Sequence, residues 1–216
     1  MRKKIYQAML ENRNKELLRQ GEEIHRLRQI EEEHAELDAF LAWLNKMCAE
    51  MQLTFCGLTK IYLNPEKTKG CYIGFVLDGA VHLNPEREYK FTLRGYSSKD
   101  MAFANMVYIA NFYLNVRPPE YDIEKAICIE DHYVRPDELK DHGIGTAAMG
   151  IIKETAKHLR GLYIYGDSKD PYDTEEKAAR RRRFYEKNGF KQEEDSAGIV
   201  HVRFDMGEYE KDKKTF

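Results

Sequence analysis

Apolar residues recur at intervals of three and four along the N-terminal part of the chain. From Leu27 to Met51 the two intervals alternate, which is the spacing of a heptad seam with one polar member, His34. Residues 1–51 contain no proline and a single glycine, Gly21, and such a composition favours helix. The seam comprises Leu27, Ile30, His34, Leu37, Leu41, Leu44, Cys48 and Met51. We therefore predict a long N-terminal helix, which either forms a coiled coil in a homodimer or packs on its own domain.

After Met51 the apolar residues begin to alternate with polar ones, and prolines and glycines separate the alternating runs. A period of two is typical of strands that are half-buried in a sheet. Predicted strands cover residues 53–63, 71–77, 89–96, 126–134, 161–165 and 199–204, with turns at 64–66 and 84–86. Helical spacing predicts helices over 146–159 and 174–188, the second ended by Gly189. This succession of strands and helices predicts an α/β domain.

Residues 103–116 fit two patterns. Polar and apolar residues alternate along the segment, as in a half-buried strand followed by a turn at 117–119. Positions 103, 106, 107, 110 and 114 also form a helical face, preceded by a capping-box pattern from Ser97 to Asp100. We interpret the segment as a strand.

Composition sets the scale of the protein. Hydrophobic residues make up 42% of the 216 residues, which suffices for a sizeable core. The predicted organisation is a helical segment over 1–51, a domain over 52–206 and a charged tail over 207–216. The formal net charge of −2 argues against a general polyanion-binding surface, so nucleic acid is not an expected partner.

The four cysteines have no short paired spacing, which argues against a zinc or redox site, and no metal is expected. No apolar run has the length needed to cross a bilayer. The basic start of the chain is followed by charged residues and not by an apolar stretch, so we expect no signal peptide. We expect a cytoplasmic protein with free thiols and no membrane contact.

A glycine-rich loop lies between the predicted strand 126–134 and the helix that follows it. Its sequence is Lys140-Asp141-His142-Gly143-Ile144-Gly145-Thr146. Glycines allow a tight turn and a close approach of the backbone, and the N-terminus of the next helix suits a pyrophosphate. A plain strand-to-helix turn is the alternative. A Rossmann dinucleotide site is disfavoured because position 148 is Ala where that fingerprint has its third glycine.

Two neighbouring motifs give this loop a family likeness. Val134-Arg135-Pro136 precedes it, and the segment 184–190 (FYEKNGF) follows about forty residues later. Together with the pattern Lys140-x-x-Gly143-x-Gly145, the chain resembles the GNAT acetyltransferase superfamily. The resemblance is strong over 126–190 and extends over 53–204. In the family an Arg or Gln stands at the place of Lys140, the spacing from Pro136 to the first glycine is one residue shorter, and Asn is frequent at the position of Ala178.

The resemblance implies a GNAT-type fold, with a mixed, mostly antiparallel central sheet flanked by helices and here preceded by the long N-terminal helix. It implies an N-acetyltransferase that moves an acetyl group from acetyl-coenzyme A to an amine by direct attack in a ternary complex. Acetyl-coenzyme A is then a co-substrate, and the family's fourth strand, matched here by 132–134, binds its pantetheine arm. The implied contacts are Tyr133, Val134, Lys140, Asp141, His142, Gly143, Ile144, Gly145 and Thr146. Tyr185 matches the family's general acid, which protonates the leaving sulfur; the alternative is that it only packs the helix on the sheet.

The alternation of side chains along the strand 126–134 suggests candidates for the general base. Alternate residues of a strand share a face, which groups Cys128, Glu130, His132 and Val134 and turns Asp131 away. Glu130 is the first candidate and His132 the second, with a solvated pair at the sheet end as the alternative.

The acceptor is not readable in the sequence. An amine on a small molecule or on a protein is expected, in a pocket lined by the N-terminal half of the domain. Tyr62, Tyr72, Tyr96 and Tyr108 are candidates for its lining. The four arginines 180–183 point in different directions around a helix, so they cannot all contact one partner. One arginine is expected to contact a phosphate and the others to face solvent or acidic neighbours. The alternative function is a non-catalytic acetyl-coenzyme A sensor or a coiled-coil scaffold.

Overall fold

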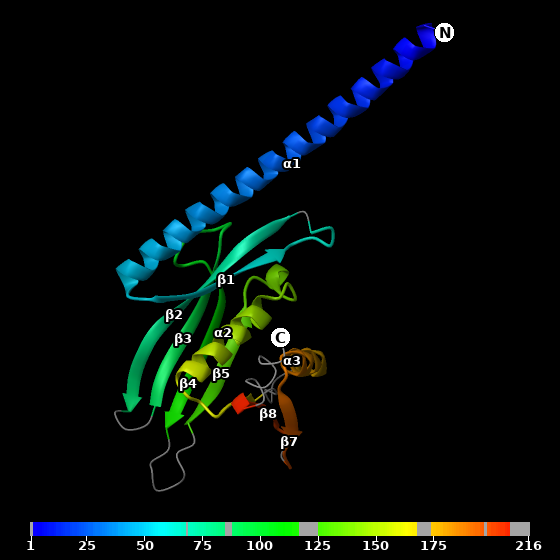
Figure 1. The fold of residues 1–216 in the computed structure, drawn as a ribbon. Coiled ribbons are helices and arrows are strands. Elements are labelled where there is room, and N and C mark those ends of the chain that lie inside the picture. The colour runs from blue at the N-terminus through cyan, green and yellow to red at the C-terminus, as the bar shows by residue number, and fades with distance from the viewer. Residues whose placement is uncertain are drawn as a thin grey trace. The chain divides into compact units, whose positions relative to one another are not determined.

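An eight-stranded mixed sheet forms the centre of the domain (Figure 1). The computed structural model describes residues 2–67, 69–84, 88–116, 125–167, 174–196 and 198–207. The strands lie in the order β1-β2-β3-β4-β5-β6-β8-β7, and only β5 and β6 run parallel. Their bounds are β1 (Thr54–Tyr62), β2 (Gly70–Asn84), β3 (Glu88–Ser97), β4 (Met106–Val116), β5 (Lys125–Val134), β6 (Tyr163–Asp167), β7 (Lys191–Glu194) and β8 (Val200–Asp205). The predicted mixed, mostly antiparallel sheet is confirmed.

Two helices of the domain follow β5 and β6. Helix α2 (Ile144–His158) packs against β1, β5 and β6, and α3 (Glu175–Lys187) packs against β7. The apolar residues of α2 recur at helical spacing, so one face of the helix is buried. The buried apolar residues on that face are Ile144, Ala148, Met149, Ile152 and Ala156. They join the core residues of β2, β4 and β5, and each fully buried aliphatic side chain contributes about 1.5–3 kcal/mol.

The predicted N-terminal helix is confirmed as α1 (Arg2–Met51). The chain divides into two compact units, residues 1–42 and 43–216, so the end of α1 belongs to the domain. There the Trp43 ring meets the Tyr96 ring edge-on at 5.5 Å, and Leu44 and Met47 are buried. The last turns of the heptad seam therefore pack on the chain's own domain. The coiled coil of the preceding residues stays a prediction; Leu17, Leu18, Ile24, Leu27 and Ile30 are exposed there.

Residues 103–116 illustrate how pairing resolves an ambiguous pattern. The strand prediction is confirmed, because β4 pairs with β3 on one side and with β5 on the other. Ser97 and Asp100 form an isolated bridge across a turn and do not begin a helix. The predicted turns at 85–86 and 117–119 and the tail from 208 onward lie outside the described residues. None of the described helices has the length and apolar character needed to cross a membrane.

Candidate active site

Strands β5 and β6 diverge within the sheet. Their parallel pairing covers only residues 126–129 of β5 and 163–166 of β6. On its other side, β5 stays paired with β4 as far as Val134. Over residues 130–134, the β5 edge toward β6 therefore has no ladder partner among the described residues. An unpaired strand edge offers N–H and C=O groups to an extended ligand.

A β-bulge at Glu130 changes which residues of β5 share a face. Ile129 pairs with Phe112 and His132 with Ala110, so Ile129 and His132 lie on the face where α2 packs. Tyr113 pairs with Cys128, and its hydroxyl donates to Glu130 Oε2 at 2.7 Å. The predicted grouping is therefore wrong, because the extra residue breaks the alternation and separates Glu130 from His132.

The bulge also corrects the orientation predicted for Asp131. This residue pairs with Asn111, so it lies on the same face as Cys128 instead of opposite to it. Glu130 and Asp131 are both exposed on that face, at the point where β5 leaves β6.

The glycine-rich loop ends at an uncapped helix N-terminus. Gly143 is the N-cap residue of α2 with φ +88°, a conformation that L side chains rarely adopt. No side chain caps this helix end, and its first turn carries no acidic residue. The N–H groups and the positive end of the helix dipole are thus left for an anion. Lys140 is ion-paired with Asp137 of the 3-10 turn Asp137–Leu139 that precedes the loop.

The C-terminal end of α3 holds Tyr185 in a fixed position. Gly189 has φ +78°, its N–H donates to the Glu186 carbonyl, and the Phe190 N–H donates to the Tyr185 carbonyl. These two bonds form a Schellman motif, which the Tyr185–Phe190 ring contact at 5.2 Å completes. Lys153 of α2 donates to the Asn188 carbonyl at 2.5 Å, so the two helices are tied together here.

The two sequence motifs meet at the divergence of the strands. A Cβ on Gly145 would lie 3.0 Å from Phe184 Cε2, so the glycine allows the Phe184 ring against the loop. The His132 ring lies 4.9 Å from the Phe184 ring and 5.6 Å from the Tyr185 ring. A glycine-rich loop, a strand that leaves its parallel neighbour and a helix-terminal tyrosine therefore converge on one gap.

Solved structures show similar folds at low identity. An aminoglycoside acetyltransferase in complex with coenzyme A and kanamycin is 18% identical, with 58% of this chain and 71% of that chain covered and a TM-score of 0.40. A protein from Desulfovibrio desulfuricans, described as a GNAT-family acetyltransferase, is 17% identical, with 54% and 69% covered and a TM-score of 0.42. The GNAT domain of an S. lividans protein is 11% identical, with 54% and 60% covered and a TM-score of 0.40.

No protein-family model and no curated protein matches the sequence. At these identities the likeness to solved structures concerns the fold alone. In this chain the glycine-rich loop follows the fifth strand, and the segment 184–190 lies at the end of the third helix.

Burial and one cation set the electrostatics beside Tyr185. Burial, and secondarily the Arg181 charge, lowers the pKa of His132 to about 4, so its ring is neutral at neutral pH. Burial also raises the pKa of Tyr185; Arg181 lowers it, and Asp167 and Asp131 raise it further. The phenol therefore keeps its proton at neutral pH and is a hydrogen-bond donor. Tyr185 is 2% exposed, and its hydroxyl makes no hydrogen bond to the described residues.

The arginine run is divided among several partners. Arg181 lies one helical turn before Tyr185 and acts on both Tyr185 and His132. Arg180 is in electrostatic reach of Asp137, and Arg182 lies 3.8 Å from Glu194 on β7. The prediction that the run cannot face one partner is confirmed. Sequence analysis missed Arg181, although its i, i+4 spacing to Tyr185 was a usable signal.

The remaining predicted contact residues differ in how far their side chains are exposed. Ile144 is 1% exposed, so its side chain belongs to the core, and Val134 packs partly in the core. Tyr133 is exposed and stacks under the Arg135 guanidinium at 4.6 Å. Asp141, His142 and Thr146 lie at the loop with partial or full exposure. Among the described residues, no group of three or more His, Cys, Asp or Glu side chains is placed to hold a metal ion.

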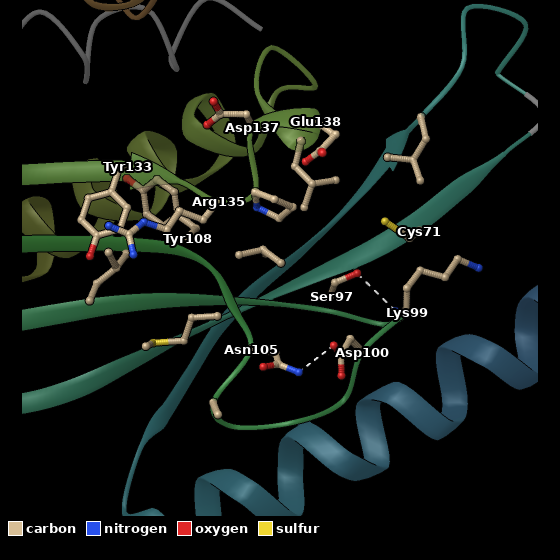
Figure 2. A pocket seen from close by; sticks show the side chains of 17 residues that line it. Cys71, Ser97, Lys99, Asp100, Asn105, Tyr108, Tyr133, Arg135, Asp137 and Glu138 are labelled. Carbon is tan, nitrogen blue, oxygen red and sulfur yellow. Dashed lines mark hydrogen bonds between the residues drawn. The ribbon is translucent and has the colours of Figure 1, made fainter.

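A cavity of about 1040 Å³ lies on the β4 side of the end of β5, and Tyr133 and the turn Asp137–Leu139 belong to its lining. Figure 2 shows Tyr133 and Arg135 on one side of it and Asn105, hydrogen-bonded to Asp100, on the other. Of the four tyrosines proposed for an acceptor pocket, Tyr108 lines this cavity; Tyr62, Tyr72 and Tyr96 do not.

The two histidines near the gap give a testable pH dependence. The pKa of His132 is lowered, so the unfolded chain binds a proton that the folded chain does not, and stability falls as pH drops from 6.5 to about 4. Hydrogen bonds to Asp167 and Asp195 raise the pKa of His201. Protonated His201 therefore stabilises the folded state below pH 6.5, and this stabilisation is lost as the pH rises through the raised pKa. We expect His132→Gln to flatten the loss of stability on acidification and His201→Gln to steepen it. Urea unfolding of the three proteins at several pH values between about 4 and 7 measures both slopes, and parallel slopes would contradict the assignment.

Proposed function

We propose that the protein is an N-acetyltransferase that moves an acetyl group from acetyl-coenzyme A to an amine within a ternary complex. The observation that carries the proposal is the meeting of the Gly143–Gly145 loop with Phe184 and Tyr185 at the gap between β5 and β6. The likeness to structures of acetyltransferases, one of them with coenzyme A bound, is consistent with it.

The residues present fit acetyl-coenzyme A. The uncapped N-terminus of α2 and Gly143, around which a Cβ would meet only open space, suit a pyrophosphate. Lys140 is ion-paired with Asp137, and its ammonium group binds a phosphate when this pair breaks. The unpaired edge of β5 over 132–134 suits the amides of the pantetheine arm. When bound, acetyl-coenzyme A supplies the thioester carbon that the amine attacks.

The two substrates approach the gap from opposite faces of the sheet. The phosphate loop, His132 and Phe184 lie on the face where α2 packs, and Glu130 and Asp131 lie on the other. Holding both reactants in line converts a bimolecular step into one within a complex, which supplies much of the rate. Tyr185 donates its phenolic proton to the departing sulfur.

Glu130 is the better candidate for the base. Its carboxylate is exposed at the bulge and is oriented by the Tyr113 hydroxyl. His132 lies on the opposite face of β5 from Glu130, where its ring contacts the Phe184 and Tyr185 rings. We assign His132 to the packing of Phe184 and Tyr185 instead.

A thermal-shift and thiol-release assay tests the function. Saturating acetyl-coenzyme A should raise Tm by several degrees, because a ligand at 100 times its Kd stabilises the folded state by about 2.7 kcal/mol. An amine panel should then release coenzyme A at rates that depend on the amine. Binding without thiol release for any amine would favour the sensor alternative, and no shift at millimolar acetyl-coenzyme A would remove the co-substrate.

A further inference from the structure

Most of α1 is exposed to solvent in the single chain. Figure 1 shows α1 as one continuous helix, and residues 1–42 form a compact unit of their own. Every residue from 15 to 35 is exposed. A helix in water owes most of its stability to the burial of an apolar face against a neighbour. The single chain therefore leaves this stretch of α1 without the packing that such a helix needs.

The exposed apolar side chains of α1 form a stripe along the helix. The heptad seam begins with Leu27 and Ile30, which are 48% and 38% exposed. Leu17 and Ile24, 57% and 52% exposed, stand seven residues apart and extend the stripe towards the N-terminus along its edge. A stripe with this spacing is the surface that two helices bury against each other in a coiled coil.

The charges of α1 are separated along its length. Residues 13–19, here called the basic segment, contain three basic residues and one acidic residue. Residues 31–38, here called the acidic segment, contain five acidic residues and no lysine or arginine. The apolar pair Ile24 and Leu27 lies midway between the two segments. The stripe is thus flanked by opposite charges at equal distances from its centre.

The two charged segments cannot neutralise each other within one helix. Their centres are about 18 residues apart, which is about 28 Å along an α-helix and several Debye lengths at physiological salt. A second α1 in parallel register would place each segment against its own copy, so like charges would meet. A second α1 in antiparallel orientation places the basic segment of each copy beside the acidic segment of the other.

We propose that residues 13–38 of α1 bind the same residues of a second copy of the chain as an antiparallel coiled coil. The dimer uses none of the residues assigned to acetyl transfer and does not depend on that function. Its two-fold symmetry doubles every contact, because each basic segment meets an acidic one at both ends of the pair.

One pair of residues beside the stripe should determine the orientation. Arg19, Arg26 and Glu33 are spaced by seven, so they lie along the same side of the stripe. In an antiparallel pair these sides face each other, and Arg19 of each copy lies beside Glu33 of the other. Arg26 lies at the centre of the pair and is ion-paired at 2.8 Å with Glu23 of its own chain, so its charge is already balanced.

Sedimentation of the full-length protein tests the dimer and its salt dependence. We expect a dimer at about 100 μM protein that dissociates more readily in about 1 M salt, where the Debye length is about 3 Å. A parallel dimer would respond in the opposite way, because salt would screen the repulsion between like segments. A chain that stays monomeric at about 100 μM overturns the proposal and leaves the stripe to a different protein.

Charge reversal tests the antiparallel orientation. Glu33→Lys and Arg19→Glu should each raise the Kd of the dimer about tenfold or more, because each change sets two pairs of like charges side by side. The double variant Arg19→Glu/Glu33→Lys should return the Kd to within about twofold of wild type. In a parallel dimer Glu33 would instead face Asp38 of the other copy, so Glu33→Lys would tighten the association.

Glu32→Lys is the matched control, since it makes the same charge change on the side of the helix turned away from the stripe. Its Kd should stay within about twofold of wild type. All three positions are exposed in the single chain, so thermal melts and circular dichroism should show a folded domain in every variant. A Glu33→Lys protein that dimerises as well as Glu32→Lys, or a double variant that is not rescued, overturns the antiparallel pairing while acetyl transfer stands.

Discussion

Tyr185→Phe is expected to lower kcat about 100-fold while the Kd for acetyl-coenzyme A stays within about twofold. The change removes only the hydroxyl, and the ring contacts with His132, Phe184 and Phe190 remain. Without the phenolic proton the sulfur must leave as a bare thiolate or be protonated by water. Since burial raises the pKa of Tyr185, the wild-type phenol is protonated throughout the neutral range, so the loss should be present at every neutral pH. Steady-state thiol release gives kcat, and calorimetry gives Kd.

Tyr96→Phe is the matched control for this experiment. Tyr96 is also fully buried, and its hydroxyl also has no hydrogen-bond partner, but it packs on Trp43 and Phe103. Removing its hydroxyl should leave kcat unchanged and should not lower stability, because no hydrogen bond is lost. A Tyr185→Phe protein that turns over like wild type would reduce Tyr185 to a packing residue of α3.

Gly145→Val is expected to abolish the stabilisation by acetyl-coenzyme A, with an affinity loss of about 100-fold or more. Even a Cβ at this position would stand 3.0 Å from the Phe184 ring, and valine adds two methyl groups. The Phe184 ring must then move away from the loop, which displaces the first turn of α2 or the His132 and Tyr185 contacts. Overpacking of this kind costs about 1–3 kcal/mol, so the variant should stay folded while it loses the site.

Gly150→Ala serves as the control within the same helix. A Cβ on Gly150 meets nothing within 4 Å, and the residue lies in the interior of α2. Alanine should raise the free energy of unfolding by about 0.5–1 kcal/mol through helix propensity, with unchanged affinity for acetyl-coenzyme A. Circular dichroism, thermal melts with and without ligand and calorimetry check both variants. Wild-type affinity in Gly145→Val would show that the two motifs need not touch for binding.

Long regular patterns were read correctly from the sequence because each depends on the chain's own period. Residues 1–51 have helical composition and spacing, and they form α1. Gly189 was predicted to end α3. The Schellman hydrogen bonds there require a positive φ, which a residue without a Cβ adopts readily. Residues 103–116 carried both periods, and only pairing with β3 and β5 selected the strand. β7 was not predicted, since its sequence KQEE contains no apolar residue and it exists through pairing with β8.

The sequence by itself determined most helices and strands, the loop glycines Gly143 and Gly145, and the Phe184–Tyr185 motif. Periodicity, backbone freedom and residue type are local properties of the chain. The tertiary structure alone decided where β5 leaves β6, which face Glu130 and His132 occupy, and that Arg181, Asp131 and Asp167 act on Tyr185. A single extra residue at Glu130 reverses the alternation of a strand, and no composition or spacing rule contains it. The gap, the bulge and the charges around the phenol depend on hydrogen bonds and contacts between segments far apart in the chain, and these are set only when the sheet is assembled.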